Sequence, residues 1–299
     1  MIFIAAILWG LDGILRRSLY GLPPITIVFF EHLIGLVLLS PFLFKVWKSE
    51  KLEKKEWYAL GVVALLSGVL GTLFFTTALL KVNFIPFSVV FLIQKLQPIF
   101  AVAMAAIILR EHITRKYVLW AALALVAGYF VTFPLGVINF AEGGAHLIAA
   151  LIAFAAAIAW GSSTALSRYT LLNHSNTFIT GVRFLLTVPI ALVFVFAMGA
   201  ASSLTQVTAT QYGYLALIAF STGMHALWIY YRGLRTTPVR VAAIVELAFP
   251  ITAVAIDYFL YGVALHYTQY LAAAVLLFAM YQVSKLSRPD GDTSILAPK

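Results

Sequence analysis

The sequence predicts an all-α integral membrane protein with ten transmembrane helices in two inverted five-helix repeats. Three observations support this prediction: a very apolar composition, ten long apolar segments, and an internal repeat spanning an odd number of segments. Of the 299 residues, 63% are hydrophobic and 10% are charged, whereas soluble domains carry about 25% charged residues. This composition excludes a soluble enzyme, and the lack of cysteine in the sequence excludes a disulfide framework or a cysteine-ligated metal site.

The ten segments are each long enough to cross a bilayer, which takes about 20 mostly apolar residues. Polar turns separate them, and the residues after the tenth segment form a polar tail. The predicted spans are residues 2–19, 25–45, 57–80, 85–109, 117–135, 147–167, 176–198, 211–233, 239–261 and 267–286.

The basic residues predict the orientation, because cytoplasmic loops are enriched in Lys and Arg. With the N-terminus inside, fifteen basic residues lie at cytoplasmic ends and three (Arg16, Arg17 and Lys81) lie at outer ends. Lys95 and Arg183 lie within spans. We therefore expect a multi-pass protein of the inner or plasma membrane with both termini in the cytoplasm. The net charge of +9 then reflects topology, and a nucleic-acid partner is not expected.

An internal repeat appears at an offset of 151 to 152 residues. It predicts a first repeat over residues 1–138, a second over 146–286 and a cytoplasmic tail over 287–299. Since each half has five spans, the second half enters the membrane from the opposite side, as in secondary transporters. The matched pairs are Trp9-Gly10 with Trp160-Gly161, Arg17 with Arg168, His32 with Arg183, Gly71 with Gly223, Pro86 with Pro238, and Pro98 with Pro250.

The chain resembles the EamA-type transporters of the drug/metabolite transporter superfamily. The resemblance rests on the Trp-Gly pair in the first span of each half, on Pro98 and Pro250 in the fourth spans, and on Leu109-Arg110-Glu111. It implies a central cavity lined by the first four helices of each half, with the fifth and tenth helices peripheral. It also implies export of amino acids or related metabolites. The second half departs from the pattern, because Gly262-Val263-Ala264 stands where a Glu is expected.

Ionisable side chains inside spans are costly and mark candidate functional sites. Glu246 is the leading candidate, because it lies four residues before Pro250 while Gln94 lies four residues before Pro98. A proline at this spacing removes a helical hydrogen bond, so we expect helix kinks with a freed carbonyl near Gln94 and Glu246. A protonated Glu246 that only links two helices is the alternative. The six intramembrane ionisable residues are Asp12, Glu31, Lys95, Arg183, Glu246 and Asp257.

Lys95 has two readings: it could hold a substrate carboxylate, or it could neutralise Glu31 or Glu246. Arg183 could bind an anion or pair within the bundle, and Asp257 could be an outer gate or a snorkelling acid. Arg16 reads as an anchor at the outer interface. The aromatic residues expected around the substrate are Trp9, Trp160, Trp228 and Tyr231, which could stack on a ring or face a cation.

These patterns predict a transporter rather than an enzyme, with no cofactor or metal. The expected activity is secondary active or facilitative export of small metabolites, above all amino acids, by alternating access. The intramembrane carboxylates make protons a candidate partner, and a uniporter or exchanger is the alternative. Uptake of a vitamin, a nucleoside or an organic cation is the alternative within transport. A lipid flippase or a membrane enzyme is the alternative of another class. The protein is expected to act as a monomer in the lipid bilayer.

Overall fold

The computed structural model describes most of the chain and is all-helical over the described residues. Several sequence-based expectations fall outside them, including those for Pro86, Pro238, Arg110, Glu111 and the tail 287–299. The described residues are 1–81, 87–109, 114–137, 144–237, 242, 245–246 and 248–286.

The helices follow the predicted spans in order, and in both halves the third span contains a π-helical segment. In the first half these are α1 (Ile2–Arg17), α2 (Pro24–Trp47), α3 (Lys54–Val63), a π-helical segment (Ala64–Gly71), α4 (Thr72–Leu80), α5 (Phe87–Gln94), α6 (Gln97–Leu109), α7 (Arg115–Thr132) and a 3₁₀ turn (Pro134–Gly136). In the second half they are α8 (Ala145–Asn173), α9 (Asn176–Ala197), a 3₁₀ turn (Ala201–Thr205), α10 (Ala209–Ile218), a π-helical segment (Ala219–Gly223), α11 (Met224–Leu234), α13 (Ala248–Tyr261) and α14 (Tyr267–Leu286).

Length and composition alone identify four spanning helices among the described residues, and these include the continuous stretch from α3 to α4. The fourth and ninth spans are instead built from shorter pieces. Pro98 and Pro250 lie in the first turns of α6 and α13, where a missing N–H group costs nothing. The prolines therefore begin new helices rather than kink continuous ones. The expectation of a freed carbonyl at Glu246 was wrong, because Phe249 donates its N–H to that oxygen at 3.0 Å.

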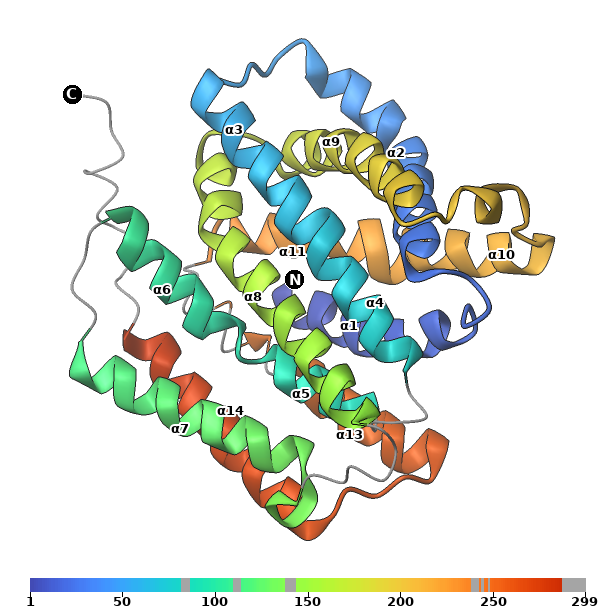
Figure 1. The fold of residues 1–299 in the computed structure, drawn as a ribbon. Helices are drawn as coiled ribbons and strands as arrows, with labels where there is room; N and C mark the ends of the chain where they lie inside the picture. The colour runs from blue at the N-terminus through green and yellow to red at the C-terminus, as the bar shows by residue number, and fades with distance from the viewer. Residues whose placement is uncertain are drawn as a thin grey trace.

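The packing reproduces the repeat (Figure 1). Helix α1 of the first half packs against α11 and α13 of the second half, and α8 of the second half packs against α4 and α6 of the first. The second spans of the two halves, α2 and α9, lie against each other. The fifth and tenth spans, α7 and α14, lie side by side at one edge of the bundle, as the family resemblance implies. The first four spans of each half are thus grouped around a common centre.

The glycine of each Trp-Gly pair lies where two helices cross. A Cβ atom on Gly10 would lie 2.7 Å from Cβ of Thr252 in α13, and one on Gly161 would overlap the Gln97 carbonyl and Cβ of Phe100 in α6. Small residues permit such close approach in membrane bundles. Since Phe100 and Thr252 are one repeat apart, the same crossing is built twice.

We expect Gly161→Ala to destabilise the protein, because the added methyl group meets a backbone carbonyl that cannot move aside. Overpacking of this kind costs about 1–3 kcal/mol. Gly61→Ala is the matched control, since a Cβ atom there meets nothing within 4 Å. Thermal unfolding of the detergent-solubilised variants measures the difference, and equal unfolding temperatures would contradict this role of the helix crossing.

At one end of the bundle the two halves are joined by a cluster of polar side chains. His174, after α8, places its ring nitrogens 3.1 Å from Glu50 and 3.0 Å from Glu56, which flank the start of α3. The Ser175 N–H also donates to Glu50 at 3.0 Å. The loop at residues 48–56 is therefore a contact between the repeats as well as a solvated, charged segment.

Candidate functional site

A central cavity lies between the two repeats, with about 970 Å³ of unfilled space counting its open mouth. The first four spans of each half supply all the described lining residues, and α7 and α14 supply none of them. The lining includes Trp9, Asp12, Arg16, Glu31, His32, Ser67, Thr72, Phe75, Lys95, Gln97, Trp160, Ser163, Thr164, Ser167, Arg183, Phe184, Thr222, Gly223, Leu227, Tyr230, Tyr231, Leu234, Glu246 and Phe249.

Two aromatic pairs form apolar walls of this cavity. The Trp9 ring lies 4.9 Å from that of Tyr230, and the Trp160 ring lies 5.2 Å from that of Phe75. Trp160 is held by a hydrogen bond from its Nε1 to the Ser67 carbonyl at 3.0 Å. Each pair joins the first span of one half to the third span of the other half. Such walls suit a flat ring, which stacks on aromatic faces.

The repeated glycines Gly71 and Gly223 make room for these walls and for a carboxylate. A Cβ atom on Gly71 would overlap the Trp160 indole, and one on Gly223 would lie 2.8 Å from Oε1 of Glu31. Both glycines end a π-helical segment, a distortion that often marks functional sites. Both repeats therefore have a glycine at this position because a larger side chain would overlap a residue that lines the cavity.

Lys95 and Glu246 form an ion pair between the repeats. The Lys95 Nζ atom lies 3.5 Å from Oε2 of Glu246, and the Tyr230 hydroxyl donates to Oε1 of Glu246 at 2.7 Å. Lys95 lies in the break between α5 and α6, while Glu246 lies in a turn before α13. Of the sequence-based readings for Lys95, neutralisation of Glu246 is the one seen in the structure.

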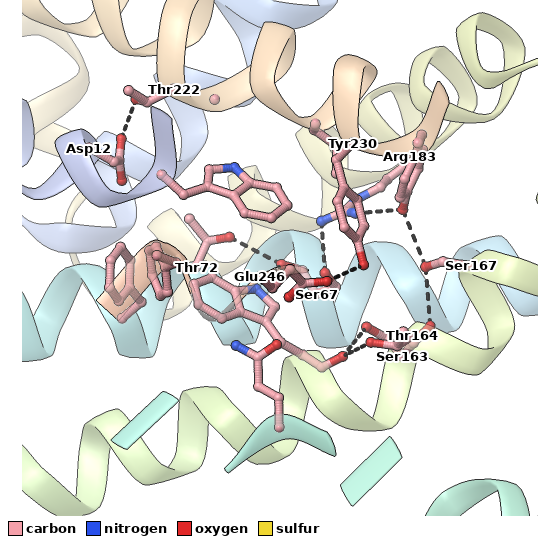
Figure 2. Close-up of a pocket in the computed structure, with 18 of the residues that line it drawn as sticks. Asp12, Ser67, Thr72, Ser163, Thr164, Ser167, Arg183, Thr222, Tyr230 and Glu246 are labelled. Atoms are coloured by element: carbon pink, nitrogen blue, oxygen red, sulfur yellow. Dashed lines mark hydrogen bonds between the residues drawn. The ribbon is translucent and has the colours of Figure 1, made fainter. Parts of the chain in front are cut away.

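A second charged group joins α1 and α2. Arg16 donates to the carboxylates of Asp12 and Glu31, at 2.7 Å for Glu31, and to the Thr76 hydroxyl at 2.9 Å. Thr222 from the other repeat donates to Asp12 (Figure 2). The interpretation of Arg16 as an interface anchor was wrong, because the residue is only 3% exposed. Its spacing of four residues from Asp12 places both on one helix face, which is the sequence signal for the contact.

The cavity also contains Arg183 from α9. Its Nη1 donates to the Tyr231 hydroxyl at 2.7 Å, and its Nη2 donates to the Ser67 hydroxyl at 2.8 Å. In Figure 2 Arg183 and Ser167 lie on the right, whereas Asp12 and Thr222 lie on the left. The cavity is therefore dipolar: two carboxylates share one guanidinium at one side, and a guanidinium bonded to neutral hydroxyls lies at the other.

Seven of the nine residues proposed from the sequence for substrate binding or coupling line the cavity: Trp9, Asp12, Glu31, Lys95, Trp160, Tyr231 and Glu246. Gln94 and Trp228 do not appear in the lining. Gln94 is fully buried, and Trp228 donates its Nε1 proton to Thr177 at 2.9 Å. The lining residues that the sequence did not single out for this role include Arg16, Tyr230 and the hydroxyl residues of α8.

Asp257 lies outside the cavity lining and contacts the other repeat. Its carboxylate accepts the Ser88 N–H at 2.6 Å, in the first turn of α5. A carboxylate at a helix N-terminus is favoured by the unpaired N–H groups and the helix dipole there. The structure thus shows Asp257 as a capping acid that supports the broken fourth span.

Comparison with known proteins gives three results. The chain matches the EamA-like transporter family over residues 1–133 and 147–285. It is 36% identical over 290 residues to the riboflavin transporter ImpX of Fusobacterium nucleatum, covering 96% of this chain and 97% of that protein. A protein of known crystal structure shares the fold with a TM-score of 0.63 over 96% of each chain, at 16% identity.

Proposed function

The chain belongs to the EamA-like transporter family of membrane proteins, and on that premise we propose that it takes up riboflavin. The observation that supports this proposal most strongly is the similarity to a riboflavin transporter over nearly the full length of both chains. The sequence alone ranked amino-acid export first and vitamin uptake as an alternative. The relative reverses that order.

The cavity adds a physical argument for a flat, polar substrate. Riboflavin combines a planar three-ring system with a hydroxylated chain. The Trp9–Tyr230 and Trp160–Phe75 pairs offer aromatic faces to the ring. Hydroxyl and carboxylate groups around them offer partners to the chain and to the ring edge.

The broken fourth and ninth spans suggest how the cavity changes access. Discontinuous helices at a repeat interface are typical of secondary transporters that work by alternating access. We propose that Lys95 and Glu246 separate and re-form as the repeats rock, and that the His174 cluster opens when its end of the bundle opens. Under the orientation proposed from the basic residues, that end and both termini are on the cytoplasmic side.

Proton coupling is proposed at the charged group on α1 and α2. Among the described residues, Asp12 and Glu31 form ion pairs with Arg16 alone, so this group has one more carboxylate than cations. An excess intramembrane carboxylate can hold and release a proton.

Amino-acid export remains the second candidate, because the dipolar cavity also fits a zwitterion. An ammonium group would lie toward Asp12 and Glu31, and a carboxylate would lie toward Arg183. An aromatic amino acid would in addition meet the aromatic walls.

Competition for uptake by the purified full-length protein in proteoliposomes tests the proposal. We expect saturable entry of labelled riboflavin that excess unlabelled riboflavin blocks and that tryptophan, thymidine and choline leave unchanged. An imposed pH gradient is expected to change the rate. Saturable tryptophan transport without riboflavin entry would instead support the amino-acid candidate.

A further inference from the structure

Arg183 differs from the other two cations of the cavity, because it forms no ion pair within the described part of the chain. Arg16 contacts Asp12 and Glu31, and Lys95 contacts Glu246. The Arg183 guanidinium instead donates to two neutral hydroxyls, at 2.7 Å and 2.8 Å. Among the described residues, its side chain therefore has hydrogen-bond partners but no carboxylate in contact with it.

The hydrogen-bonding capacity of Arg183 is also incompletely used. A guanidinium has five N–H donors, and the two bonds to Tyr231 and Ser67 occupy two of them. The Nε atom is buried without a hydrogen-bond partner. A buried donor left unsatisfied destabilises the protein, and more so when it is charged. A ligand that accepts from the remaining donors would remove this destabilisation.

The surroundings hold the guanidinium in place without neutralising it. The Tyr231 hydroxyl accepts from Arg183 and donates to the Ser167 hydroxyl at 3.2 Å, and Ser167 donates in turn to the Ser163 carbonyl at 3.1 Å. This directed chain ends on the backbone of α8 (Figure 2). The planar fork of an arginine is then pre-organised for two oxygen acceptors that lie in one plane.

The charges of the cavity favour a neutral ligand over an anion. Asp12, Glu31 and Glu246 balance Arg16, Lys95 and Arg183, so an added net charge would be uncompensated at membrane depth. A cyclic imide edge offers two carbonyl acceptors and no net charge. Its N–H is itself a donor and cannot bond to a guanidinium, so the contact would be made to one of the carbonyl oxygens. The flavin ring has such an edge.

We propose that Arg183 determines specificity by donating to a carbonyl oxygen of the imide edge of the flavin ring. This assignment rests on the proposed function and goes beyond it, because it states which part of the substrate is recognised and by which residue. The hydroxylated chain is then recognised elsewhere in the cavity.

Ligand binding to the detergent-purified full-length protein, followed by flavin fluorescence, tests the assignment. We expect wild-type protein to bind riboflavin and also lumichrome, which keeps the imide edge and lacks the chain, while ribitol does not compete. Arg183→Gln should weaken both flavins by about 10- to 100-fold, as expected for loss of hydrogen bonds from a charged donor. Arg232→Gln is the charge-matched control, because Arg232 is exposed on α11 outside the lining, and it should bind like wild type.

Riboflavin methylated on N3 distinguishes loss of the Arg183 contact with the imide edge from a general loss of structure in the Arg183→Gln protein. The methyl group crowds both carbonyl oxygens of the edge, so the modified ligand should bind wild type at least about tenfold more weakly. It should bind Arg183→Gln almost as riboflavin does, because the contact with the guanidinium is already lost there. If Arg183→Gln does not fold, the same comparison with Arg183→Lys decides the question. Lysine keeps the charge without the planar fork.

Two outcomes would overturn the assignment. Binding by Arg183→Gln equal to that of Arg232→Gln, with N3 methylation penalised equally in both, would refute the role of Arg183 and leave riboflavin uptake standing. No flavin binding by wild type would refute the proposed function, and the assignment with it.

Discussion

Arg16→Gln is expected to abolish riboflavin uptake and to lower the unfolding temperature. The substitution leaves the carboxylates of Asp12 and Glu31 facing each other without the cation that both contact. Removing one partner of a buried charge group costs about 3–5 kcal/mol. Uptake into proteoliposomes and thermal unfolding in detergent measure the two effects.

Arg17→Gln is the neighbouring control, since the Arg17 guanidinium lies over the Tyr261 ring at 4.6 Å and the residue does not line the cavity. It should change both measurements less. The double variant Arg16→Gln with Asp12→Asn should regain part of the stability, because it removes one uncompensated charge. An Arg16→Gln protein that unfolds at the wild-type temperature and transports normally would show that the group has no such role.

Glu246→Gln is expected to reduce uptake by tenfold or more while the protein still folds. The amide can still accept from the Tyr230 hydroxyl, but Lys95 loses the counter-charge that lies 3.5 Å away. The Glu246 side chain is 15% exposed toward the cavity, so water offsets part of the loss. Uptake over a range of pH values, with a folding check by gel filtration, is the measurement.

The double variant Lys95→Gln with Glu246→Gln distinguishes the effect of an unpaired charge on stability from the role of the ion pair in transport. It should be more stable than Glu246→Gln alone, because no charge is left unpaired, and it should remain inactive. Unchanged uptake and an unchanged pH profile in Glu246→Gln would remove the ion pair from the transport cycle.

Much of the fold could be predicted from the sequence, because bilayer thickness sets the helix length and the repeat sets the arrangement. The spans ending at Leu80 and beginning at Tyr267 match the helix bounds of the structure. The rotation of each helix about its axis was harder to predict. A helix such as α2 is apolar almost all round, so its sequence does not show which face meets the cavity.

The contacts between distant residues could not be predicted for the same reason. Lys95 and Glu246 are in different repeats, and their pairing depends on how the broken spans meet. From the sequence, Arg16 was interpreted as an anchor at the outer membrane interface because it lies near the end of α1. In the structure it turns inward, since two carboxylates stabilise it there.

Counterflow of labelled riboflavin tests most directly the claim that one cavity is exposed alternately to the two sides of the membrane. Proteoliposomes are loaded with excess unlabelled riboflavin and diluted into labelled riboflavin. The predicted result is a transient accumulation of label above its equilibrium level, absent from protein-free liposomes. Entry of label without this overshoot, or no entry by folded protein, would contradict a riboflavin carrier that works by alternating access.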